Sequence, residues 1–440
     1  MSRLEVSGQR THNQEVAMFG ERVRQVSAIG AALTTVFALA VLYSGTTRAS
    51  LTLTDKVGEN EMKLQIYGFA QLEIRGGKGW DLLSDLTGGD GPMFAAQRIR
   101  WGMNYFHGPI AGKVFLDFSQ IADFSESVPI DTDDDGQFDD TKRVWLDQGG
   151  LPLYIKDAFV AYRHSNALMV RLGMIKSPLG MDFTVPGWNL DIVQRGGLEK
   201  VLVLERDMGL TISGRLIGQN RFTDKPLKTD GLEMGTERQG YGFGYDFFVG
   251  NPAGRSLSVV WDRAVLGDAL SYAGRLHFDY GKPLHVELAY GISEKAGGAE
   301  DTEDYEVMDF GVASELFESK LELKLEYISG NNIRGEEDRK QTAAVLTAGY
   351  TFIPSLQLMV KTYQAEAERI GFSDTKLGNT YIGFNWFLAR VSEKHRDLQR
   401  HKVVLNYVIV NGDDVDASTP WNGLAGYRDS AYLLQWQYRY

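Results

Sequence analysis

One acidic run, "DTDDDGQFDD", has the residue types and spacing to bind a metal ion. Its alternating aspartates are followed directly by Gly136, as in the first half of an EF-hand-type calcium loop, where alternate oxygens converge on the cation and the glycine allows a sharp turn. Lys142 stands where such a loop needs a bidentate acid, a role that Asp139 or Asp140 could take over. The sequence predicts either a solvated acidic loop or a structural Ca2+ site and no required cofactor, with the candidate ligands Asp131, Asp133, Asp135 and Asp139.

A second group of candidate residues consists of basic and acidic side chains at every second position of apolar segments. In "RIRWGMNYFH", Arg98 and Arg100 alternate with Ile99 and Trp101, so that one face of a strand is charged and the other is apolar. If the apolar face meets lipid, the charged face lines the inside of a barrel. There the charges either attract small solutes or pair across strands to keep the wall rigid. The pore-lining residues assigned in this way are Arg98, Arg100, Lys113, Asp117, Arg171, Arg215 and Arg275.

About sixteen segments that alternate in polarity would position these side chains. They cover 63–75, 96–107, 111–120, 154–164, 167–176, 206–217, 240–250, 268–280, 283–293, 303–315, 320–330, 341–353, 355–366, 379–390, 400–412 and 430–440. Their connections alternate between short turns and long loops, which is typical of an up-and-down barrel across a membrane. The connection 218–239 breaks this alternation, either as an insertion or because the strand register there is wrong. The sequence predicts an all-β, transmembrane, antiparallel β-barrel of about 16 strands.

The last segment, "AYLLQWQYRY", carries its large and aromatic residues on one face. An unpaired strand of this kind would aggregate, so we expect its aromatic face to meet lipid and its edge to pair with the first strand. A terminal aromatic residue, here Tyr440, also resembles the C-terminal signal of Gram-negative outer-membrane proteins.

The start of the chain has the pattern of a secretory signal. Arg22 and Arg24 precede an apolar core, and small residues follow that core up to Ala49. An uncleaved membrane anchor is the alternative, since the apolar run is at the lower limit for spanning a bilayer. The predicted organisation is a signal and extension over 1–49, a short periplasmic lead-in over 50–62, and an outer-membrane barrel with long extracellular loops over 63–440.

Composition excludes several other classes of function. The chain has no cysteine, which excludes disulfides and thiolate metal sites, and its net charge of -12 without a basic run argues against a nucleic-acid partner. An outer-membrane enzyme acting on lipids is one alternative, but none of the seven histidines accompanies a G-x-S-x-G motif. A soluble calcium-binding β-rich module is the other. A channel that is not an enzyme is the favoured interpretation.

The segments "KDAFVAYRH", "VRLGMIKSPLGMDF" and "VLERDMGLTISGRL" resemble the corresponding run of the phosphate-selective porin O/P family, most strongly over 156–216. The resemblance implies a homotrimeric channel in the outer membrane of a Gram-negative bacterium that passes small hydrophilic solutes. It also implies that the loop 177–205 folds into the channel, with Lys176 at its entrance as the eighth candidate pore-lining residue. Since acids such as Asp117 also point inward, we expect a modest preference for anions such as phosphate and not strict selectivity.

Overall fold

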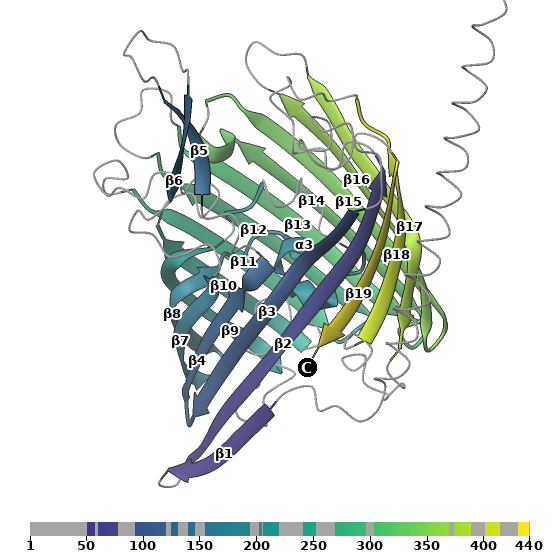
Figure 1. The fold of residues 1–440 in the computed structure, drawn as a ribbon. Coiled ribbons are helices and arrows are strands. Elements are labelled where there is room, and N and C mark those ends of the chain that lie inside the picture. Colours follow the sequence, from purple (N-terminus) through teal and green to yellow (C-terminus); the bar gives the residue numbers. More distant parts are fainter. Residues whose placement is uncertain are drawn as a thin grey trace, which may run out of the picture.

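A closed sheet is the main feature of the computed structural model (Figure 1). The model describes residues 51–57, 60–77, 93–119, 125–130, 140–145, 155–193, 202–204, 206–219, 241–251, 269–295, 303–335, 337–368, 374–388, 401–413 and 430–439. Within these residues, no helix is long and apolar enough to cross a membrane.

Sixteen antiparallel strands form the barrel, each paired with its neighbours in chain order. They are β2 (Asn60–Gly77), β3 (Met93–His107), β4 (Ile110–Asp117), β7 (Ile155–Ser165), β8 (Leu168–Lys176), β9 (Arg206–Gln219), β10 (Tyr241–Gly250), β11 (Ser271–Tyr280), β12 (Leu284–Ser293), β13 (Tyr305–Leu316), β14 (Leu321–Asn331), β15 (Lys340–Ile353), β16 (Leu356–Glu368), β17 (Thr375–Phe387), β18 (His401–Val410) and β19 (Ala431–Arg439). The predicted fold class and strand number are confirmed.

The last strand closes the barrel on the first, as the aromatic C-terminal segment predicts. β19 pairs with β2 from Ala431 opposite Gly77 to Arg439 opposite Phe69, and the two strands lie side by side in Figure 1. Tyr440 lies outside the described residues. Closure leaves no strand edge exposed to lipid, which a membrane-spanning sheet requires.

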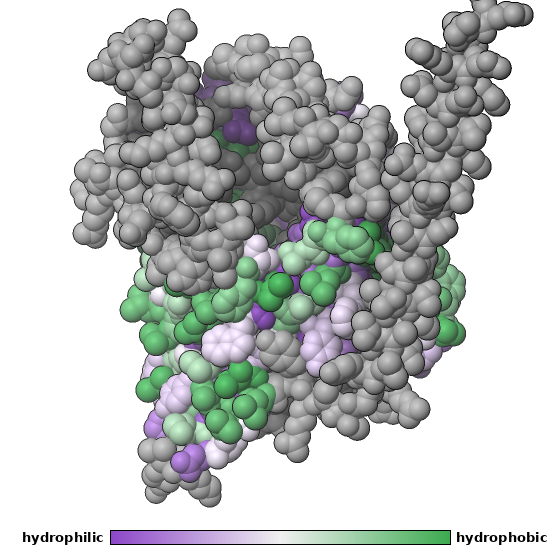
Figure 2. All heavy atoms as spheres, in the orientation of Figure 1, coloured by the Kyte–Doolittle hydropathy of each residue, from purple (hydrophilic) through white to green (hydrophobic). Residues whose placement is uncertain are grey.

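Alternate residues face outward and inward along most of the barrel wall. Leu276 is 63% exposed, whereas its neighbour Arg275 is 1% exposed. Large apolar side chains cover the outer surface, and Figure 2 shows them gathered over the barrel wall. This exterior is suited to lipid, and the polar residues that alternate with it point into the barrel.

The connections follow the predicted alternation with two exceptions. β9 and β10 stay paired up to Gln219 opposite Tyr241, so the long connection between them is an insertion and the strand register is correct. The connection from β17 to β18, residues 388–400, is a second long one at this end of the barrel. Tight turns join β3 to β4, β7 to β8, β11 to β12, β13 to β14, and β15 to β16.

Three further features lie outside the barrel wall. β1 (Leu51–Val57), within the predicted lead-in, pairs with the beginning of β2. β5 (Ser125–Ile130) and β6 (Asp140–Trp145) form a separate two-stranded sheet, with Ile130 opposite Asp140. The candidate calcium ligands Asp131, Asp133, Asp135 and Asp139, and the predicted signal over 1–49, lie outside the described residues.

Candidate functional site: the internal loop and the charged inner wall

The connection that follows β8 lies inside the barrel. It contains the short helix α3 (Met181–Thr184) and the 3-10 turn η2 (Gly187–Asn189), and nearly all of its residues from 177 to 193 are buried. Two of its acids pair with lysines of the wall: Asp182 Oδ2 lies 2.5 Å from Lys361 Nζ, and Asp191 Oδ2 lies 2.8 Å from Lys324 Nζ. The expected inward fold of this loop is therefore observed for its described residues.

Apolar packing explains why the loop turns inward. Leu179, Phe183, Ile192 and Val193 of the loop, with Leu202 to Leu204, belong to one buried cluster with inward residues of β10 to β19. The inner wall is apolar at the level of this cluster, as at Ala289, and charged two residues away, as at Glu287. Burying a large apolar side chain stabilises by about 1.5–3 kcal/mol, so the cluster is a substantial attachment for the loop.

An aromatic group holds the loop at Trp188. Its ring makes edge contacts with Tyr67, Phe69 and Phe115, whose ring centroids lie 5.6–6.2 Å away. Gly102, between Tyr67 and Phe115 on the neighbouring strands, leaves room for this group, because a Cβ there would lie 2.6 Å from Phe115 Cδ2.

A cavity of about 40 Å3 lies between the loop and the wall formed by β3, β4, β7, β8 and the start of β9. Five cationic side chains and one carboxylate line it, together with apolar groups that include Phe115 and Trp188. The charged lining residues are Arg100, Lys113, Arg171, Lys176, Arg206 and Asp157. A surplus of positive charge beside low-dielectric side chains favours an anion over a cation at this place.

Local contacts hold these cations in place. Asp157 accepts from both Lys113, at 2.8 Å, and Arg206, at 3.0 Å. Arg100 Nε donates to Asp117 Oδ2 at 2.7 Å. Lys176 Nζ donates to the carbonyls of Phe183 and Thr184 and so ties the strand to α3 at the entrance of the loop.

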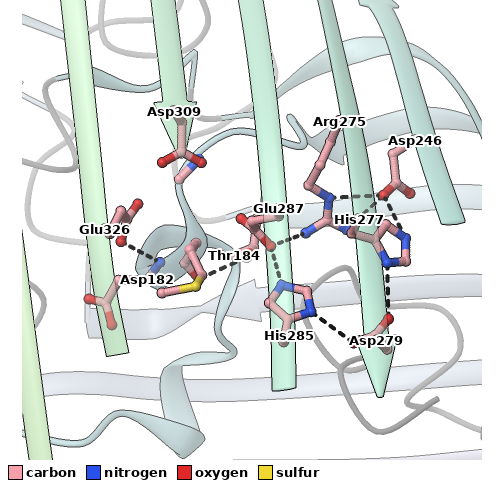
Figure 3. Close-up of polar contacts among 12 residues, drawn as sticks. Asp182, Thr184, Asp246, Arg275, His277, Asp279, His285, Glu287, Asp309 and Glu326 are labelled. Carbon is pink, nitrogen blue, oxygen red and sulfur yellow. Dashed lines mark hydrogen bonds and ion pairs between the residues drawn. The ribbon is translucent and has the colours of Figure 1, made fainter. Parts of the chain in front are cut away.

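A second charged network lies in the wall formed by β10, β11 and β12 (Figure 3). Arg275 bridges Asp246 and Glu287, with shortest distances of 2.7 and 3.3 Å. His285 lies between Glu287 and Asp279, whose oxygens are 2.7 and 2.8 Å from its two ring nitrogens. Apart from the contact of His285 with Glu287, which lies within β12, these contacts join neighbouring strands, so the network stiffens the wall.

Two acids on the next two strands of the wall, Asp309 of β13 and Glu326 of β14, hold the start of α3 (Figure 3). The backbone N–H of Gly180 donates to Asp309 Oδ2 at 3.2 Å, and that of Asp182 donates to Glu326 Oε2 at 2.9 Å. The inner wall therefore has a basic side at β3 to β9 and an acidic group at β12 to β14, with α3 beside the latter.

All eight predicted pore-lining residues point inward, but the structure separates them into groups. Arg100, Lys113, Arg171 and Lys176 line the cavity, and Asp117 pairs with Arg100 beside it. Arg98 lies against the loop at Gly187. Arg215 donates to Asp279 at 2.6 Å and, with Arg275, belongs to the second network.

Sequence reasoning missed Arg206 and the loop attachments. Arg206 begins β9 beside inward Asp207, so strand parity places it on the other face, yet its side chain reaches Asp157. Among the described residues, no group of three or more acidic or histidine side chains has the arrangement of a metal site.

The fold is similar to that of several known outer-membrane channels. OmpF of Salmonella typhi in complex with daunomycin is 12% identical, with a TM-score of 0.52 over 88% of this chain and 100% of the other. An anion-selective porin from Comamonas acidovorans is 14% identical, with a TM-score of 0.51 over 86% and 100%. The outer-membrane channel DcaP of Acinetobacter baumannii is 12% identical, with a TM-score of 0.51 over 88% and 99%.

No protein-family model matches the sequence, and neither does any curated protein. The resemblance to the phosphate-selective porin O/P family therefore rests on its motifs alone, and the structural similarities establish the fold. A closed 16-stranded barrel with an apolar exterior is the architecture of Gram-negative outer-membrane proteins, which places the chain in that membrane.

Proposed function

We propose that the chain forms a water-filled channel for the passive diffusion of small hydrophilic solutes across the outer membrane, with a modest preference for anions such as phosphate. The observation that carries the proposal is the cavity between the internal loop and the wall, where five cations and one carboxylate line the space. A fixed charge acts strongly on an ion in such a place, because the path between them is poorly screened.

Local and net charge predict opposite selectivities for this protein. The chain carries a net charge of -12, which by itself would attract cations. In this proposal ions pass beside the internal loop, so the cations of the cavity weigh more than acids elsewhere in the chain.

Reversal potentials of the purified protein in planar bilayers with unequal salt on the two sides test the proposal. We expect anion preference in the parent and a weaker preference in the double variant Arg100→Gln, Lys176→Gln. Lys282→Gln is the matched control, because Lys282 lies at a tight turn and pairs with Glu315 on the surface. Equal reversal potentials in the parent and the double variant would contradict the assignment of the cavity.

The proposal makes the protein a passive channel and not an enzyme. The inward histidines His277 and His285 lie in the second charged network, where acids contact their rings. Purified barrel in vesicles should release small solutes without hydrolysing the lipid. Release of fatty acid by the purified protein would favour the lipid-acting enzyme instead.

Assembly as a homotrimer is part of the proposal and is supported by the family resemblance. Crosslinking in native membranes, followed by electrophoresis without heating, should give a trimer band. A monomer band alone would restrict the proposal to a single-chain channel.

A further inference from the structure

Side chains on four neighbouring strands donate hydrogen bonds to the backbone of the internal loop, and two of these strands form the seam where the barrel closes. Gln71 of β2 donates to the carbonyl of Gly187 at 2.9 Å, and Gln437 of β19 donates to that of Trp188 at 3.0 Å. The series continues on β18 and β17, where Lys402 donates to Leu190 and Asn385 to Asp191. The loop thus crosses the strands of the seam, with the carbonyls of these four residues facing the wall.

The two glutamines stand directly opposite each other in the β2–β19 pairing. Both side chains are 0% exposed, and Gln71 Nε2 donates to Gln437 Oε1 at 2.6 Å. Each glutamine therefore bonds both the facing strand's glutamine and the loop. Buried amides of this kind are costly to leave unsatisfied, so the seam and the loop stabilise each other.

Arg98 sets the direction of these hydrogen bonds. It stands opposite Gln71 on β3, and its Nη1 donates to Gln71 Oε1 at 2.7 Å. Because a guanidinium only donates, the oxygen of Gln71 must face Arg98 and its NH2 group must face the loop and Gln437. The oxygen of Gln437 is then turned to Gln71, which leaves its NH2 group for Trp188.

The Trp188 side chain also spans the seam. Tyr67 and Phe69 of β2 contact one part of its ring, and the Arg439 guanidinium of β19 lies 4.4 Å from its ring centroid. Gly187 lies against Arg98 and Arg100, where a Cβ would come within 3.4 Å of both side chains. The loop is therefore seated on both strands of the seam at once.

We propose that Arg98, Gln71 and Gln437 form a relay that positions the internal loop across the closing seam, so that the width of the channel depends on barrel closure. Arg98 acts in this relay as a positioning residue. Arg98 then contributes to ion preference, as expected from the sequence, indirectly: it determines where the loop lies in the channel.

The test follows the loop directly with a spin label. The chain has no cysteine, so Asn189→Cys gives a single labelling site in η2, at a half-buried side chain whose Oδ1 has no hydrogen-bond partner in the described part of the chain. In otherwise parental protein we expect an immobilised label. Gln71→Glu keeps the shape and the contact with Arg98 but cannot donate to Gly187 or Gln437, so we expect a mobile spectrum and a larger single-channel conductance.

Gln71→Met and Arg98→Met should have the same effect, and each variant is first checked for a heat-modifiable barrel. The matched control is Gln341→Glu on β15, because Gln341 is equally buried and its amide has no hydrogen-bond partner among the described residues. The relay would be overturned if the label stayed immobilised in all folded variants of Gln71 and Arg98. It would also be overturned if the label in the Gln341→Glu control were as mobile as in those variants. The mobility of the spin label tests the relay independently of the proposed channel function, whereas the change in single-channel conductance rests on that function. Cation preference in the parent would therefore overturn the proposed selectivity and leave the relay standing.

Discussion

Replacing Arg275 with glutamine should destabilise the barrel strongly. The Arg275 side chain is fully buried and holds two carboxylates, with Nη2 at 2.7 Å from Asp246 and Nη1 at 3.3 Å from Glu287. Removing one partner of a buried ion pair leaves the other charge uncompensated and costs about 3–5 kcal/mol. We expect a loss of this size in the free energy of unfolding, because the variant leaves both acids without their arginine.

Denaturant unfolding of barrels refolded in lipid vesicles, followed by the gel shift between folded and unfolded chains, measures this loss. The matched control is Lys282→Gln, because the Lys282 side chain is 43% exposed and pairs with Glu315 at 3.3 Å. Exposed pairs contribute about 0–1 kcal/mol, so this control should unfold nearly as the parent does. Adding Asp246→Asn to Arg275→Gln should recover part of the stability. An equal loss in the free energy of unfolding in Arg275→Gln and Lys282→Gln would refute the view that the network stiffens the wall.

Three further perturbations test the fold and the acidic loop. Deleting residues 436–440 should abolish insertion, because β19 loses its pairing from Trp436 to Arg439 with β2, and a heat-modifiable barrel in the membrane after this deletion would contradict that expectation. Gly102→Val should lower the free energy of unfolding by about 1–3 kcal/mol through overpacking. Gly274→Val should cost less, since a Cβ at Gly274 meets no atom within 4 Å, and equal losses would contradict the packing argument. Calorimetry should show weak calcium binding by the 131–140 loop, with a Kd of about 0.1–1 mM. The double variant Asp133→Asn, Asp135→Asn should abolish this binding. Equal heats in the parent and the double variant would support the interpretation as a solvated loop instead.

The barrel itself could be predicted from the sequence because one face of each strand is in lipid. Alternation in "RIRWGMNYFH" assigns Arg98 and Arg100 to the inside, and both are buried there. The same alternation in "AYLLQWQYRY" places Gln435 and Gln437 inward, and both are. A two-residue period survives in a single sequence because lipid and lumen differ so strongly.

The partners of the inward residues could not be predicted, because they depend on where a long loop lies in three dimensions. Parity groups Arg98 with Arg100, yet one contacts Gln71 at the seam and the other pairs with Asp117. The sequence did contain a signal for the inward loop, because some strands are apolar on both faces. In "HKVVLNYVIV", for example, the adjacent residues Val403 and Val404 lie on opposite faces of the strand. Val404 is buried in the apolar cluster that holds the loop, whereas a water-lined wall would have a polar residue there.

The reversal potential of the parent protein in unequal KCl across a planar bilayer tests the central claim most directly. The claim is that a channel in an acidic chain is governed by the five cations of the cavity beside its internal loop. We expect a reversal potential displaced toward the equilibrium potential of chloride. A reversal potential displaced toward the equilibrium potential of potassium, which the net charge alone would give, would contradict this claim.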